Sequence, residues 1–195
     1  MLKSGSELRS RNLYLHRLIA FQDAEPVKII TGIRRCGKSS LLKLMAQHLR
    51  NNGVAEEQII ELNFESMEFR RMGVETLYQY VKERLPDRKR AYLFFDEIQR
   101  IEQWQDAVNS FRVDFDCDIY VTGSNAYLLS SEYATYLAGR SVEIKMFPLS
   151  FREFLDFHGY TVRERKSPKG GIGKRIYDED GESYEPKELL EAYLK

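Results

Sequence analysis

The sequence lacks the features that mark several classes of protein. Only two cysteines, Cys36 and Cys117, occur among 195 residues, too few for a disulfide scaffold. No apolar run approaches the roughly 18–20 residues of a membrane-spanning helix, and the first ten residues lack the apolar core of a secretory signal. We therefore expect a cytoplasmic protein with no membrane partner.

An excess of either charge is also missing. The 30 Lys and Arg residues balance the 30 Asp and Glu residues, so the net charge is zero. This balance argues against a chain that mainly coats nucleic acid, although it allows a local basic patch. The hydrophobic share of 43% and the charged share of 31% are typical of a globular chain, and disorder is not expected.

The pattern that is present is an alternation of strands and helices. Short apolar segments predict strands, and amphipathic periodicity predicts helices. The strands are expected at 27–30, 59–64, 91–95, 118–121 and 141–147, and the helices at 8–21, 40–50, 74–85, 104–115 and 127–137. Such alternation predicts an α/β fold with a mainly parallel five-stranded sheet and helices on both faces.

The composition changes after about residue 160. A basic run at 163–175 is followed by an acidic run at 178–191, and Asp180-Gly181 predicts the turn of a hairpin. Pro186 predicts the start of a short last helix, and Gly170 to Lys174 reads as a flexible loop. The expected parts are an N-terminal helix over 1–25, a core over 26–160, and a hairpin with a linker over 161–195.

The strongest motif is a phosphate-binding loop, Gly32-Ile33-Arg34-Arg35-Cys36-Gly37-Lys38-Ser39, which fits G-x-x-x-x-G-K-[ST] between a predicted strand and helix. The glycines let backbone N–H groups point at phosphate oxygens, and the helix adds the positive end of its dipole. Lys38 suits the β and γ phosphates, and Ser39 offers a hydroxyl to Mg²⁺. The candidate nucleotide-binding residues are Gly32, Arg35, Cys36, Gly37, Lys38, Ser39 and Ser40.

A second motif follows the apolar strand at 91–95, which ends in Asp96-Glu97. Together with the phosphate loop it reads as a Walker B motif. We expect Asp96 to hold Mg²⁺ with Ser39, and Glu97 to deprotonate the attacking water. No N-K-x-D guanine-reading sequence occurs, so ATP is preferred over GTP as the ligand.

For three further residues, the sequence leaves both a functional and an ordinary role open. Ser124 and Asn125 follow the fourth strand, where a polar group could hold the γ-phosphate or the water, but such residues also favour turns. Arg140 precedes the fifth strand. It could stabilise transition-state charge on a phosphate, or it could be a surface charge that complements a helix dipole.

These motifs together resemble a family of AAA+-like P-loop ATPases of bacteria and archaea. The resemblance rests on GIRRCGKSSLL, LFFDEIQ, VTGSNAYLLSSE, LAGRSVEIKMFPLSFREF and LLEAYLK, and it covers 11–152 strongly. It implies a three-layer ATPase core in which another strand separates the Walker A and Walker B strands. It assigns Ser124 or Asn125 to sensor 1 and Arg140 to the place of an arginine finger, which makes a homo-oligomer a hypothesis.

Members of this family are about twice as long, with a C-terminal domain of unknown function. The resemblance therefore implies an ATPase module without its effector, either a piece of a longer protein or a short form.

Two main functions follow from the sequence. The first is Mg²⁺-dependent ATP hydrolysis coupled to an unknown partner. The second is a nucleotide-binding regulatory module with negligible turnover that binds protein or DNA, for which the basic run at 163–175 is the candidate contact. A small-molecule kinase is a third hypothesis, but the sequence shows no clear lid segment of the kind that such kinases use.

Overall fold

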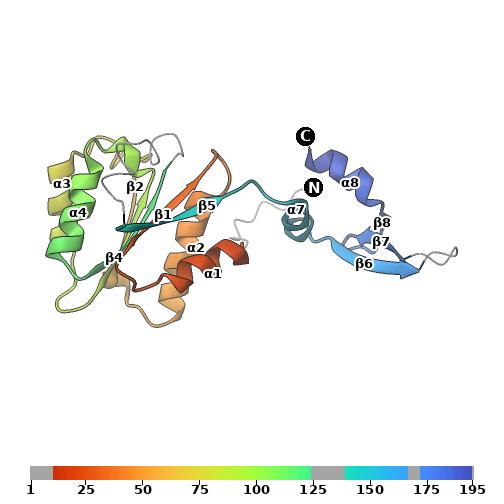
Figure 1. Cartoon of the computed structure of the whole chain (residues 1–195), viewed down its shortest axis with the longest axis horizontal. Coiled ribbons are helices and arrows are strands. Elements are labelled where there is room, and N and C mark those ends of the chain that lie inside the picture. The colour runs from red at the N-terminus through yellow and green to blue at the C-terminus, as the bar shows by residue number, and fades with distance from the viewer. Residues whose placement is uncertain (1–10, 124–138, 167–171, 195) are drawn as a thin grey trace. The chain divides into compact units, whose positions relative to one another are not determined.

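The computed structural model describes residues 11–123, 139–166 and 172–194 (Figure 1). The chain divides into two compact units, Met1–Pro148 and Leu149–Lys195, and each is described by itself. This division falls before the end of the core expected at 160, because the helix at 151–157 packs within the C-terminal unit.

The first unit is built on a parallel five-stranded sheet. Its strands are β1 (Val27–Gly32), β2 (Ile59–Asn63), β3 (Ala91–Asp96), β4 (Cys117–Thr122) and β5 (Ser141–Met146), in the order β2-β3-β4-β1-β5. All four neighbouring pairs are parallel, so the carboxyl ends of the strands share one edge. The predicted α/β fold is confirmed, and β4 separates the strands that carry the two motifs.

Helices cover both faces of this sheet. Figure 1 shows α1 (Asn12–Ala20) and α2 (Lys38–Asn51) on one side, and α3 (Val74–Lys82) and α4 (Trp104–Asp114) on the other. The sequence of β3 explains why both faces are covered. Leu93 and Phe95 pack with α3 and α4, whereas Tyr92 and Phe94 pack with α1 and α2. Because residues 91–95 of this strand are all apolar or aromatic, it needs a packing partner on each face.

The helix bounds differ slightly from those predicted. The helix α2 begins at Lys38, two residues before the predicted start, because Gly37 already takes the left-handed N-cap conformation. The helix expected at 127–137 lies outside the described residues. Short 3₁₀ helices, η1 (Glu56–Gln58) and η2 (Ile98–Arg100), precede β2 and follow β3. Within the described part of the chain, no helix has the length and apolarity to cross a membrane.

The second unit contains a small antiparallel sheet, with one helix before it and one after it along the chain. Its elements are α7 (Phe151–Phe157), β6 (Thr161–Lys166), β7 (Ile172–Tyr177), β8 (Ser183–Tyr184) and α8 (Pro186–Tyr193). The predicted hairpin corresponds to β7 and β8, in which Ile176 pairs with Tyr184, and the predicted last helix is α8.

The strand β6 was not predicted from the sequence. The structure pairs β6 antiparallel with β7, so residues 172–174 lie in a strand, and the interpretation of Gly170 to Lys174 as a flexible loop is wrong for that part. Charge obscured the strand, because only Val162 is apolar among its central positions. Val162 faces Ile176 across the pair, and the Arg163 guanidinium lies 5.0 Å from the centre of the Tyr177 ring.

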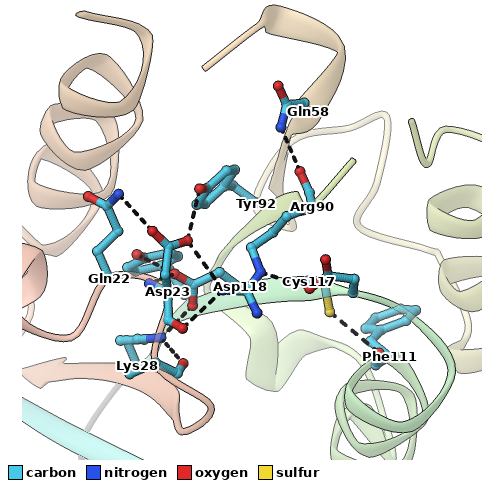
Figure 2. A network of polar contacts seen from close by, with 12 residues as sticks. Gln22, Asp23, Lys28, Gln58, Arg90, Tyr92, Phe111, Cys117 and Asp118 are labelled. Atoms are coloured by element: carbon cyan, nitrogen blue, oxygen red, sulfur yellow. Dashed lines mark hydrogen bonds and ion pairs between the residues drawn. The ribbon is translucent and has the colours of Figure 1, made fainter. Parts of the chain in front are cut away.

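A buried polar network ties strands together near their amino ends (Figure 2). Lys28 of β1 and Asp118 of β4 form an ion pair with side chains 0% and 1% exposed. Asp118 Oδ2 also accepts hydrogen bonds from the Tyr120 hydroxyl and from the backbone N–H of Asp23, each at 2.8 Å. Burial, reinforced by Asp118, raises the pKa of the Tyr120 hydroxyl, which therefore keeps its proton and remains a donor.

Candidate functional site

The phosphate loop leaves β1 at the carboxyl edge of the sheet and depends on glycine at both ends. A side chain at Gly32, where φ is +153°, would meet the carbonyl oxygen of Met146 at 2.6 Å. Gly37, where φ is +94°, caps α2 in a left-handed conformation that favours glycine. The two glycines therefore fix the path of the loop between strand and helix.

The first turn of α2 faces a pocket at this edge. Gly37 supplies no side-chain acceptor to the N–H groups of that turn, which otherwise need a partner. Lys38, Ser39 and Ser40 all line the pocket. An uncapped helix start with a lysine and hydroxyls beside it is suited to an anion such as a phosphate group.

Lys38 joins the two sequence motifs. Its side chain is only 6% exposed, and its Nζ donates to the carbonyl oxygens of Gly32 at 3.3 Å and Ile33 at 3.4 Å. The same Nζ lies 3.9 Å from Oε1 of Glu97. The ammonium group and the carboxylate thus share one site, as the pairing of the motifs predicts.

Thr122, at the end of β4, organises the acidic pair that follows β3. Its hydroxyl accepts a hydrogen bond of 3.0 Å from the backbone N–H of Glu97 and donates to Oδ1 of Asp96. Glu97 has the left-handed backbone angles φ 55° and ψ 47°, which cost a non-glycine residue about 1–2 kcal/mol. The Thr122 bond helps to hold that strained turn and with it the direction of the carboxylate.

The pocket has a volume of about 640 Å³. It brings together six of the predicted residues: Arg35, Gly37, Lys38, Ser39, Ser40 and Glu97. Four lining residues were not among those predicted: Arg34, Glu65, Gln99 and Arg100. Arg100 forms an ion pair of 3.0 Å with Glu65. The four cationic side chains of the lining outnumber its two carboxylates, Glu65 and Glu97, and this excess of positive charge favours an anion.

Other predicted residues lie outside this pocket. Asp96, the last residue of β3, is only 8% exposed. Cys36 is buried in the hydrophobic core that includes α2. Ser124 and Asn125 fall outside the described residues. Arg140 is exposed and precedes β5, where its carbonyl accepts from the N–H of Val27 at the amino end of β1. The strand β1 has six residues. At about 3.3 Å per residue, the amino end of β1 lies about 20 Å from the phosphate loop at its carboxyl end.

Arg11 links the phosphate loop to the end of β5. The side chain is 5% exposed, and its guanidinium donates to the carbonyl oxygens of Cys36 at 2.9 Å, Phe147 at 2.8 Å and Pro148 at 3.3 Å. It also lies 4.5 Å from the centre of the Tyr14 ring. A single buried arginine thus fixes the loop backbone against the segment that closes the first unit.

Sequence reasoning missed Thr122 and Gln99 as members of the site, for different reasons. Thr122 carries a signal, since it ends β4, the strand next to β3, but Ser124 and Asn125 offer similar polar side chains at the same strand tip, so the sequence does not single it out. Gln99 ends the LFFDEIQ segment that carries the family resemblance, but nothing in the sequence assigns it a role. Its place in the pocket depends on the left-handed turn at Glu97, which the sequence does not reveal.

Comparison with known families and proteins agrees with this geometry. A family model described as an AAA domain matches residues 24–155. An uncharacterized protein of Haemophilus influenzae is 49% identical over 148 residues, covering 75% of this chain and 37% of that protein. An uncharacterized protein of Methanocaldococcus jannaschii is 34% identical over 142 residues, covering 72% of this chain and 31% of its own. The chain thus spans about a third of the length of these relatives.

Two solved structures share the fold. A DNA polymerase III gamma subunit-related protein of Thermotoga maritima matches with a TM-score of 0.53 at 14% identity, over 73% of this chain and 48% of its own. RIF2 of Saccharomyces cerevisiae matches with a TM-score of 0.52 at 10% identity, over 78% of this chain and 62% of its own. At these identities the likeness shows the fold alone.

Proposed function

The chain belongs to this AAA domain family, and on that premise we propose that it binds ATP with Mg²⁺ and hydrolyses it to ADP and phosphate. One observation carries the proposal. Lys38 and Ser39 of the loop and Glu97 of the acidic motif line a single pocket, with Lys38 Nζ 3.9 Å from Glu97 Oε1. This places a phosphate-binding cation beside a base.

The donor atoms at the site fit Mg²⁺, which prefers hard oxygen ligands. Ser39 offers a hydroxyl from the pocket wall, and Asp96 offers a carboxylate whose Oδ1 is already fixed by Thr122. Since Asp96 does not line the pocket, it would reach the ion through bound water. When bound, the ion would neutralise charge on the β and γ phosphates.

The residues of the chain then divide the reaction between them. The first turn of α2 and Lys38 hold the phosphates, and Glu97 accepts a proton from the attacking water. The water oxygen forms a bond to the γ-phosphorus as the bond to the β–γ bridging oxygen breaks. ADP and phosphate leave, and the proton passes from Glu97 to solvent. Arg35 and the pocket's other arginines balance the charge of the polyphosphate.

The first test compares the full chain with Lys38→Ala. We expect MgATP to raise the melting temperature of the full chain in a saturable way and phosphate to be released. The variant should lose both effects, because its pocket lacks the buried cation. ATP-dependent stabilisation of equal size in Lys38→Ala would contradict the proposed site.

A second prediction concerns Arg140. The residue cannot reach the pocket of its own chain, so we propose that it completes the site of a neighbouring copy in a homo-oligomer. Lys38→Ala and Arg140→Ala subunits should each be inactive alone, and mixing them should restore up to about a quarter of the turnover per subunit when active pairs form at random. Full turnover by Arg140→Ala alone would assign Arg140 to the surface, and turnover that does not recover on mixing would contradict the role between subunits.

A regulatory module with negligible turnover is the second candidate, because the chain spans only about a third of its relatives. It predicts ATP-dependent stabilisation with no phosphate release, alone or with protein or DNA. The basic run is a weak case for DNA binding. It lies partly in β6 and β7, where Arg175 already forms an ion pair of 2.7 Å with Glu185.

A further inference from the structure

We propose that Gln99 is a positioning residue for hydrolysis, which orients the Glu97 carboxylate. This inference rests on the function proposed above. Gln99 lies in η2, the short helix that begins directly after Glu97, and its side chain lines the same pocket. The left-handed turn at Glu97 lets the side chains of Glu97 and Gln99 meet, whereas residues two apart in a regular helix do not face each other.

The two oxygens of the Glu97 carboxylate have different neighbours. Oε2 accepts a hydrogen bond of 2.5 Å from Nε2 of Gln99, whereas Oε1 lies 3.9 Å from Lys38 Nζ. The opposite orientation of the Gln99 amide would set its carbonyl oxygen against a carboxylate oxygen, so the donor end faces Glu97. Gln99 therefore fixes one oxygen of the base and leaves the other directed at the phosphate-binding lysine.

The other end of the amide is unsatisfied. Oε1 of Gln99 is buried and has no hydrogen-bond partner among the residues that the structure describes. Buried acceptors without a partner are costly and few in native proteins, so each needs an explanation. Among the described residues, the hydrogen bond that Nε2 donates to Glu97 is therefore the one that holds this amide.

Phosphate binding gives this arrangement its use. When Lys38 moves to the phosphates, Oε1 of Glu97 loses its cation neighbour while Oε2 stays bonded to Gln99. The attacking water can then donate one hydrogen to Oε1 of Glu97, while the bond from Gln99 holds the carboxylate in that direction. The water gives its proton to Glu97 as its oxygen bonds to phosphorus and the bond to the bridging oxygen breaks.

The test is Gln99→Met, which keeps the length of the side chain and removes both the donor and the acceptor. We expect kcat to fall about 10- to 100-fold, as for a misaligned general base. KM for ATP and Kd for ADP should stay within about twofold, because the phosphate loop is untouched. A readout independent of turnover is ADP with aluminium fluoride, which mimics the planar phosphoryl group with its axial water. The variant should bind this complex about tenfold more weakly.

Gln105→Met is the matched control. Gln105 is a buried amide of α4 whose Nε2 also lacks a partner, but it does not line the pocket. This variant should keep the kcat of the unmodified chain. Equal losses of kcat in both variants, or a loss of ADP affinity in Gln99→Met, would show a structural role and overturn the proposal.

The outcomes also separate this inference from the function on which it rests. Normal turnover by Gln99→Met refutes the positioning role alone, because the unmodified chain still hydrolyses ATP. If the unmodified chain binds ATP but releases no phosphate, the proposed hydrolysis is refuted, and the positioning role falls with it.

Discussion

Glu97→Gln is expected to lower ATP turnover at least about 100-fold while ATP binding persists. The substitution keeps the shape of the side chain and removes the group that takes the proton from water, and general-base catalysis typically contributes 10²–10⁴-fold. The Lys38 neighbour and the loop remain, so the phosphates keep their contacts. The measurement is phosphate release under saturating MgATP, together with the ATP-dependent shift in melting temperature.

The control for this prediction is Glu102→Gln, the same substitution at an exposed site five residues along the chain. It should turn over ATP at the rate of the unmodified chain. Turnover of Glu97→Gln within a few-fold of that rate would remove Glu97 from the role of base. A loss of ATP binding in Glu97→Gln would instead show that the carboxylate supports the pocket through Lys38.

The parts of the site that sequence predicted are those whose chemistry is local. The loop from Gly32 to Ser39 needs only its own glycines and the helix that follows, so its pattern predicts its geometry. The same holds for the apolar strand before Asp96, whose two packed faces follow from its composition. These elements line up because parallel strands end at one edge of the sheet.

The parts that sequence could not predict depend on contacts between distant segments. The hydroxyl of Thr122 matters because β4 lies beside β3, and Gln99 matters because Glu97 takes a left-handed turn. Arg11 contacts Phe147, which is 136 residues away in the sequence. No local pattern contains these distances, since they arise from how the sheet is ordered.

The same limit applies to Arg140. Its spacing before β5 agrees with an arginine that faces phosphate, but the sequence cannot tell which subunit's phosphate it would face. The parallel register places Ser141 opposite Val27, at the amino end of β1. The sheet's polarity thus removes the role within one subunit and leaves the role between subunits as the proposal to test.

Lys28→Met is expected to destabilise the chain more than any substitution in the pocket. It leaves Asp118 charged and buried, with a side chain 1% exposed and no cation beside it. Removing one partner of a buried ion pair typically costs about 3–5 kcal/mol, which corresponds to a fall in melting temperature of about 6–20 °C for a chain of this size. The measurement is thermal unfolding of the full chain without nucleotide.

The double variant Lys28→Met with Asp118→Asn separates the charge from the hydrogen bonds. The side-chain amide introduced at position 118 would be neutral. Its oxygen could still accept the two hydrogen bonds that Asp118 accepts in this structure, from the Tyr120 hydroxyl and from the backbone N–H of Asp23. The double variant should therefore melt above Lys28→Met alone. Lys89→Met, which breaks an exposed pair with Glu57, is the matched control and should shift the melting temperature by no more than about 4 °C. If Lys28→Met melts like that control, the buried pair does not stabilise the fold, and the amino ends of β1 and β4 are held by packing alone.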